Sequence, residues 1–273
     1  MHSIAAIVWD VDPELFPSLF ESLPIHPRWY GLLFASGFLF GYQIMKRILV
    51  KEGKPLDWMD SLLIYVIIAT VLGARLGHVF FYDWKEYKDN LSEIFKIWNG
   101  GLASHGAAIG ILLALWFWTK RVSKMSYLWI LDRIVITVAL AGCFIRLGNF
   151  VNSEILGIPT DLPWGVVFAR VSNVARHPAQ LYEAIAYLFV FIFLYVSYWK
   201  WNRGKKQGYL FGMFLALVFG FRFLVEFIKE NQSDRIEADT LLNMGQLLSI
   251  PLVIAGIFFV VRSLKQVPDG ANG

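Results

Sequence analysis

The sequence predicts an all-α membrane protein with about seven transmembrane helices. Of its 273 residues, 57% are hydrophobic and only 17% are charged, which is far from the balance of a soluble domain. Seven apolar stretches approach the roughly 20 residues of helix that cross a bilayer core. They span residues 28–48, 60–82, 101–119, 127–150, 178–199, 208–229 and 243–262. No linker divides the chain, so residues 1–273 are expected to form a single polytopic domain, with a short external segment around 151–177.

The distribution of basic residues predicts how these helices are oriented. Thirteen lysines and arginines follow the first, third, fifth and seventh spans, against eight in the longer connections on the other side. Because positive residues are enriched in cytoplasmic loops, the amino terminus is expected outside and the carboxyl terminus inside. These basic residues form short clusters without a basic face or stacked aromatic residues, so no nucleic-acid partner is expected.

Polar groups inside the spans gather in the half of the membrane predicted to be outer. Arg75, Arg146 and Arg222 each lie past the middle of a helix that runs outward. The helices that begin on the same side carry a second set of polar side chains near their first turns: Tyr30, His105, His177 and Glu183. Such groups are costly in lipid unless they pair or bind something, so they predict a functional site.

Residues 142–157, which read GCFIRLGNFVNSEILG, contain the densest group of these polar residues. Arg146, Asn149 and Asn152 are three residues apart and lie close to one face if the helix continues, with Glu154 just beyond. This face either binds the phosphate head group of a lipid or forms a buried polar patch that fixes helix packing. Arg146 has no acidic residue three or four positions away, which favours a bound anion at that side chain.

The other two arginines have more ordinary interpretations. Arg222 and Glu226 are four residues apart on one helix, a spacing that favours a structural ion pair. Arg75 is consistent with a long side chain that reaches toward the membrane surface. It lies in the sequence ARLGHV, which resembles IRLGNF around Arg146 and suggests a trace of an internal repeat. Tyr30 is consistent with an interfacial aromatic residue.

His105 lies in the glycine-rich sequence NGGLASHGAAIG. Gly100 and Gly101 permit a tight backbone before the helix, and Gly106 and Gly110 form a small-residue face that another helix can approach closely. At such a contact the histidine either hydrogen-bonds across helices or, because it titrates near neutral pH, takes a proton from a thiol.

The sequence RHPAQLYEA at 176–184 is typical of a helix start, with Pro178 in the first turn and His177 just before it. Gln180 and Glu183 then lie on one side of that helix, where they are expected to support the polar cluster rather than react.

No metal or cofactor is expected. The five histidines are scattered without the spacing of a metal site, and no glycine-rich phosphate loop is present. Cys143 is the single cysteine, so internal disulfides and multi-cysteine metal sites are excluded.

These motifs together resemble the prolipoprotein diacylglyceryl transferases of bacterial membranes. The resemblance covers almost the whole chain through seven motifs in order: RWYG at 28–31, GARLGHVFFYD at 73–83, NGGLASHG at 99–106, RLGNFVNSEILG at 146–157, RHPAQLYE at 176–183, FRFLVEF at 221–227 and MGQLLSIP at 244–251.

Some positions depart from the pattern of that family. Ile145 and Ala107 stand where the family usually has glycine, and Ser104 replaces a common phenylalanine. Many members carry a tyrosine four residues before the arginine of the sixth span, where this chain has Val218. The short segment between Gly157 and Arg176 implies a reduced external arm over the site.

The resemblance implies transfer of the diacylglyceryl group from phosphatidylglycerol to the lipobox cysteine thiol of a preprolipoprotein, with release of glycerol phosphate. His105 would be the candidate base for the thiol, and Arg146 and Arg222 would stabilise the phosphate leaving group. The nucleophile belongs to the substrate, so Cys143 is expected to be dispensable. The expected substrate-binding residues are Tyr30, Arg146, Asn149, Asn152, Glu154, Gly157, Arg222 and Glu226, and the expected supporting residues are Arg75, His177, Gln180 and Glu183.

The expected location is the bacterial cytoplasmic (inner) membrane, with the active site toward the outer leaflet. The leading alternative is a transporter of anionic lipids, which would also need arginines in the bilayer. A transporter predicts polar groups along both halves of its pore, whereas the inner halves here are apolar except for Asp132 and Arg133. A seven-helix receptor fits the number of spans but not the density of arginines.

Overall fold

The computed structural model describes residues 7–20, 26–96, 100–230 and 242–266. The chain divides into two compact units, one formed by Met1–Gln43 with Asp132–Gly273 and the other by Ile44–Leu131. The long elements of both units are helices, which confirms the all-α fold class. The division within the chain does not follow a linker, because the boundary falls inside two continuous helices, α2 (Trp29–Lys51) and α6 (Tyr127–Val151).

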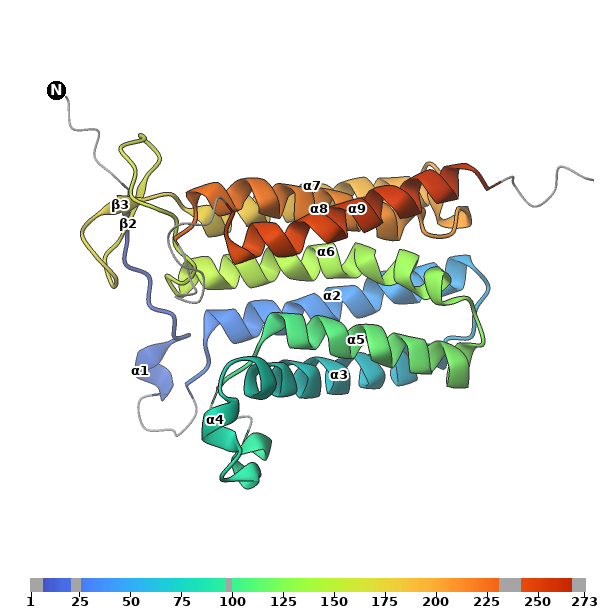
Figure 1. The fold of residues 1–273 in the computed structure, drawn as a ribbon, viewed down its shortest axis with the longest axis horizontal. Helices are drawn as coiled ribbons and strands as arrows, with labels where there is room; N and C mark the ends of the chain where they lie inside the picture. Colours follow the sequence, from blue (N-terminus) through green and yellow to red (C-terminus); the bar gives the residue numbers. More distant parts are fainter. Residues whose placement is uncertain (1–6, 21–25, 97–99, 231–241, 267–273) are drawn as a thin grey trace, which may run out of the picture. The chain divides into compact units, whose positions relative to one another are not determined.

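The larger unit is a set of helices held together by small residues. Figure 1 shows α7 (Ala179–Trp199), α8 (Tyr209–Val225) and α9 (Met244–Leu264) running side by side. The backbones of α8 and α9 come very close, since a Cβ at Gly212 would lie 2.7 Å from the carbonyl oxygen of Gly256. Within the same unit α2 meets α6 where Gly37 packs against Ala141. The remaining short helices of this unit are α1 (Pro17–Phe20), η4 (Arg203–Lys205) and η5 (Glu226–Ile228).

Asp132 and Arg133, the polar exceptions predicted in an apolar half, serve the fold. The fully buried carboxylate of Asp132 accepts hydrogen bonds from the backbone N–H groups of Gly208, over 2.7 Å, and Phe211, over 2.9 Å. These groups lie at the start of α8, where N–H groups lack partners within the helix. Arg133 donates to the carbonyl oxygen of Gly204 over 3.0 Å. Both side chains therefore satisfy the backbone of the η4–α8 connection.

A small three-stranded sheet, which the sequence did not predict, lies in the larger unit beyond the end of α6. Strand β1 (Ile7–Trp9) pairs in parallel with β2 (Val166–Phe168), and β2 pairs antiparallel with β3 (Ala175–Arg176). Trp9 and Phe168 pack against Phe150 of α6, with ring centroids 4.4 and 5.7 Å from that residue. The sheet thus gives the segment predicted to be external, around 151–177, an ordered anchor on α6.

The smaller unit is centred on α3 (Trp58–Phe81) and α5 (Ser104–Trp118), joined through α4 (Trp84–Tyr87) and η1 (Leu91–Phe95). The predicted small-residue contact is confirmed. Gly106 lies against Gly77 and the carbonyl oxygen of Gly73, and Gly110 packs against Ala69 and Gly73. Gly100 and Gly101 adopt φ values of 83° and 71°, which are strained for residues with a Cβ, so the predicted tight backbone before this helix is also confirmed.

Among the described residues, six helices have the length and apolarity to cross a membrane: α2, α3, α6, α7, α9 and the continuous helix Tyr209–Ile228. The third span predicted from sequence corresponds to α5, whose 15 residues are fewer than a bilayer core needs. It is short because the glycine-rich turn delays its start to Ser104. The helical path continues beyond Trp118 through the five-residue π-helix η3 (Thr119–Ser123).

We expect Gly106→Val to destabilise the protein, because the new side chain would collide with the α3 backbone at Gly73 and Gly77. Overpacking of this kind typically costs about 1–3 kcal/mol. Thermal unfolding in detergent should show a lower midpoint for this variant. Gly220→Ala is the matched control, since a Cβ there meets nothing within 4 Å. Equal midpoints for the two variants would contradict the close α3–α5 contact.

Candidate active site

Arg146, near the carboxyl end of α6, starts a chain of side-chain contacts that reaches the turn after the helix. Its Nη1 atom donates to Oδ1 of Asn149 over 3.2 Å, and Nδ2 of Asn149 donates to Glu154 Oε2 over 3.0 Å. Asn152 donates to the other oxygen of that carboxylate over 3.1 Å. The four polar residues singled out from their spacing are therefore joined by hydrogen bonds.

The turn that carries Glu154 has an unusual backbone. Ser153 and Ile155 have φ values of 56° and 57°, a left-handed conformation that is rare for a β-branched residue and typically costs about 1–3 kcal/mol. The turn is held by the N–H of Glu154, which donates to the carbonyl oxygen of Asn149 over 2.9 Å, and by the side-chain amide of Gln180, which donates to the carbonyl oxygen of Glu154. These bonds hold the backbone of the turn, while the Asn149 and Asn152 amides hold the Glu154 carboxylate.

Gly157 allows three backbone segments to meet. A Cβ at this position would lie 2.5 Å from the Cβ of His177 and 2.8 Å from the carbonyl oxygen of Ile228. Its N–H donates to the carbonyl oxygen of His177 over 3.1 Å, and the N–H of Ile158 donates to that of Ile228 over 3.0 Å. The geometry accounts for a glycine here by packing, while its predicted contact with substrate stays a prediction. The ring of His177 faces Tyr182, with Nδ1 3.3 Å from the hydroxyl.

Glu183 supplies the partner that the sequence did not reveal for Arg146. Its side chain is fully buried, and Oε2 lies 2.9 Å from Nε of Arg146, whose side chain is 15% exposed. The acid nearest in sequence, Glu154, instead accepts the two asparagine amides. Gln180 and Glu183 are both fully buried near the start of α7, so they do lie on one side of that helix and face the polar cluster, as predicted. The helix begins at Ala179, one residue after Pro178.

Arg222 is held less tightly than its spacing from Glu226 suggested. Its Nε atom is 3.7 Å from Glu226 Oε1, beyond hydrogen-bond distance, and this buried nitrogen has no hydrogen-bond partner. The Glu226 carboxylate is taken up by others: Lys229 lies 2.8 Å from Oε1, and Asn243 donates to Oε2 over 3.3 Å. Gly245, at the start of α9, leaves room for this carboxylate, because a Cβ there would lie 2.5 Å from its carbon.

Two phenols adjoin the arginines. Tyr30 packs on Gly148, where a Cβ would lie 2.7 Å from its ring, and interacts electrostatically with Glu154 and Arg146. Tyr187 of α7 is 7% exposed, hydrogen-bonds Arg146 and lies within electrostatic reach of Arg222. Sequence reasoning missed Tyr187, whose only signal was its position four residues after Glu183. Tyr187 thus places a phenol beside Arg222 from α7.

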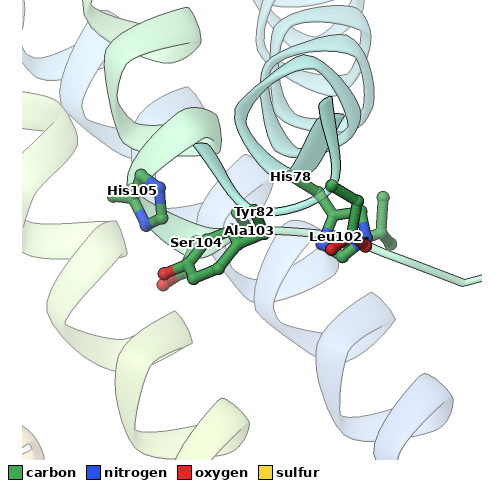
Figure 2. Close-up of a pocket in the computed structure, with 7 residues that line it drawn as sticks. His78, Tyr82, Leu102, Ala103, Ser104 and His105 are labelled. Atoms are coloured by element: carbon green, nitrogen blue, oxygen red, sulfur yellow. Dashed lines mark ion pairs between the residues drawn. The ribbon is translucent and has the colours of Figure 1, made fainter. Parts of the chain in front are cut away.

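His105 lines a pocket formed by residues of the smaller unit. Figure 2 shows the side chains around it, and the cavity has a volume of about 380 Å³. Tyr82 contacts both histidines of the pocket, with ring centroids 5.5 Å from His105 and 6.0 Å from His78. Nε2 of His78 is 2.7 Å from Asp83 Oδ2, so that nitrogen carries the hydrogen of the pair. The pocket is lined by His78, Tyr82, Asp83, Leu102, Ala103, Ser104 and His105.

Arg75 is buried rather than extended toward a membrane surface. Its side chain donates to main-chain carbonyl oxygens of Glu93 and Gly100 over 2.7 Å and of Ile94 over 2.8 Å, and it stacks over the Tyr87 ring at 5.0 Å. The residue is 3% exposed. The snorkelling interpretation is therefore wrong: Arg75 holds the connection between α3 and α5.

These features define a multi-pass α-helical membrane protein that buries ionised side chains near the ends of α6, α7 and α8. Residues 17–262 match the family model of prolipoprotein diacylglyceryl transferase, and the chain belongs to this family. The resemblance inferred from the motifs is confirmed, and with it the expectation of a transferase.

Three relatives illustrate how close the similarity is. Each is named phosphatidylglycerol-prolipoprotein diacylglyceryl transferase. The protein of Tolumonas auensis is 48% identical over 95% of this chain and 98% of its own length. That of Chloroherpeton thalassium is 48% identical over 97% of both chains. That of Porphyromonas gingivalis is 45% identical over 96% of both chains.

We expect Arg75→Lys to destabilise the smaller unit, although it keeps the charge. A lysine ammonium cannot reproduce the planar fork that reaches several carbonyl oxygens, and each buried group left without a partner costs about 1–3 kcal/mol. Thermal unfolding and protease sensitivity around residues 84–101 should report the loss. Lys85→Gln, which removes an exposed charge from the same region, is the control. A snorkelling arginine would instead tolerate lysine.

Proposed function

We propose that this chain transfers the diacylglyceryl group of phosphatidylglycerol to the lipobox cysteine of a preprolipoprotein, the first step of lipoprotein maturation. The activity is the one named for its relatives. The observation that carries the proposal in this chain is the Arg222 guanidinium, whose buried Nε has no hydrogen-bond partner. Tyr187 interacts with both Arg222 and Arg146, so this donor belongs to the same cluster as the Arg146–Glu183 pair. Such a donor is suited to an anionic ligand.

The reaction breaks the bond between the glyceryl carbon and a phosphate oxygen, and forms a carbon–sulfur bond to the thiol. Negative charge grows on the leaving phosphate oxygen, so positioned cations lower the barrier. Arg146 and Arg222 have this role in our proposal, and glycerol phosphate leaves. Asn149, Asn152 and Glu154 orient the head group.

The side chains that hold the arginines complete this part of the site. Glu226 and Tyr30 position the arginines or contact the glycerol of the substrate, and Gln180 and Glu183 support the cluster from α7. The proposal draws support from the contacts within the larger unit, in which Glu183 binds Arg146 and Tyr30 lies within electrostatic reach of the same arginine.

The thiol must lose its proton before it attacks carbon, and His105 is the proposed base. Its exposed ring lines a cavity of about 380 Å³, large enough for small side chains of an extended peptide. The nucleophile comes from the substrate, in agreement with the buried position of Cys143.

We further propose that the protein lies in the bacterial cytoplasmic (inner) membrane, with its amino terminus outside and this site toward the outer leaflet. The support is the bias of basic residues between alternate connections. The comparisons give no support to an anionic lipid transporter, and Asp132 and Arg133 are used by the backbone of α8 and η4 rather than left to line a path.

Arg146→Ala should reduce transfer by at least about 100-fold, because it removes a cation from the leaving group. The assay incubates purified protein with phosphatidylglycerol and a lipobox peptide, and measures the peptide's gain of one diacylglyceryl mass. Arg262→Ala, which removes an exposed arginine in the last turn of α9, is the control. Retained activity in a folded Arg146→Ala protein would refute the phosphate role.

Cys143→Ser should remain active within about 3-fold, since the acceptor thiol belongs to the peptide and not to the enzyme. The same mass assay measures it, with intact-protein mass spectrometry as a second readout. Loss of activity, together with a lipid adduct on the unmodified protein, would instead indicate a covalent lipidated enzyme.

A further inference from the structure

Lys229 is a buried cation to which neither the motifs nor the proposed mechanism gives a role. Its side chain is 5% exposed. It follows η5, and its backbone pairs with Gly157 in an isolated antiparallel bridge. The neighbouring N–H of Glu230 donates to the carbonyl oxygen of Leu156 over 3.0 Å. Main-chain pairing thus holds the backbone on both sides of Lys229.

The ammonium of Lys229 lies between the two carboxylates that hold the arginines. Nζ is 2.8 Å from Glu226 Oε1 and 3.8 Å from Glu183 Oε1. Glu183 is the partner of Arg146, and Glu226 is the looser partner of Arg222. Within the described ranges, Lys229 is the cation with ion pairs to both carboxylates, so it links the two arginine pairs into one cluster.

This cluster carries an excess of positive charge. It contains three cations, Arg146, Arg222 and Lys229, against the carboxylates of Glu183 and Glu226. Glu154 joins Arg146 only through the Asn149 amide and is exposed to solvent, so water screens its charge and it weighs less in this balance than the two glutamates. Arg176 has its own partner in Glu230, at 2.9 Å. The excess is only partly buried, since the Arg222 side chain is 34% exposed, and one monoanion bound at that arginine would balance it.

We propose that Lys229 is the third cation of the phosphate site, and that it acts by neutralising Glu183 and Glu226 so that both arginines are free to bind the lipid phosphodiester. This inference rests on the proposed function. In the empty site Arg146 and Arg222 face the two glutamates. When the phosphodiester binds, the guanidiniums turn toward its oxygens, and Lys229 keeps the glutamates from being left as unpaired buried charges.

The chemistry of the side chain suits this positioning role. An ammonium is a compact charge that contacts two carboxylates from a single point, whereas a guanidinium is a flat fork matched to one phosphate or carboxylate. The distances agree with these roles. Glu226 lies closer to Lys229 than to Arg222, and Nε of Arg222 has no hydrogen-bond partner.

The test compares three variants with the unaltered protein. Lys229→Gln removes the charge, Lys229→Arg keeps it, and Lys229→Gln/Glu226→Gln removes one charge of each sign. Initial rates of peptide modification are measured against phosphatidylglycerol concentration in detergent micelles, which separates KM from kcat. Binding of phosphatidylglycerol, and of diacylglycerol as a control lipid without phosphate, is measured directly for each protein by native mass spectrometry.

We expect Lys229→Gln to weaken phosphatidylglycerol binding and raise its KM by about 30-fold or more, with a smaller change in kcat, since truncating one partner of a buried charge pair typically costs at least about that factor. Lys229→Arg should stay within about 5-fold of the unaltered protein. The double variant restores the excess positive charge and should bind phosphatidylglycerol better than Lys229→Gln, while the loss of Glu226 keeps its binding below that of the unaltered protein. Binding of diacylglycerol, which has no phosphate, should change little throughout.

Unchanged KM and binding in a folded Lys229→Gln protein would overturn the proposal. So would a double variant that binds no better than Lys229→Gln, because Lys229 would then not act through the carboxylate. If Lys229→Gln does not fold, the double variant and Lys229→Arg decide the question. If the unaltered protein transfers nothing to the peptide, the proposed function fails, while the binding comparison still tests the role of Lys229.

Discussion

The ion pair between Arg146 and Glu183 is the interaction on which the rest of this arrangement depends. A guanidinium inside a helix bundle of a membrane is unfavourable unless its charge and donors are met by the protein. Glu183, fully buried at the start of α7, meets that requirement from a second helix. Asn149 accepts a further hydrogen bond from Arg146, and Tyr187 and Lys229 contact the second oxygen of Glu183. One charged pair between α6 and α7 thus dictates which side chains surround it.

Close backbone approach makes this cluster possible. Gly157 carries no side chain, so the segment after α6 lies against both His177 and Ile228. The bridge between Gly157 and Lys229 then directs the end of α8 toward the start of α7. The β-sheet and the aromatic contacts of Phe150 anchor the other side of the same segment. The close backbone packing at Gly157 therefore positions charged side chains that come from three helices.

The sequence predicted the parts of the structure that follow local rules. Apolar length located the helices, and glycine spacing located the contact of α3 with α5 around Gly106. It did not find the Glu183 partner of Arg146, because spacing of three or four residues reports neighbours on one helix and not across two. The parallel pairing of residues 7–9 with 166–168 was missed for a related reason. Two three-residue strands far apart in the chain leave no periodic pattern to read.

Arg75 and Arg146 show how an intramembrane arginine is assigned to packing or to ligand binding. Both lie in an R-L-G sequence late in a long helix, so their local sequences do not separate them. Arg75 ends on main-chain carbonyl oxygens, which are neutral acceptors that the fold must satisfy in any case. Arg146 ends on an ionisable carboxylate that is shared with a second cation. Arg146 can therefore exchange its carboxylate partner for a phosphate without leaving backbone carbonyl oxygens unpaired, whereas Arg75 cannot. Binding and release of a phosphate require such an exchange.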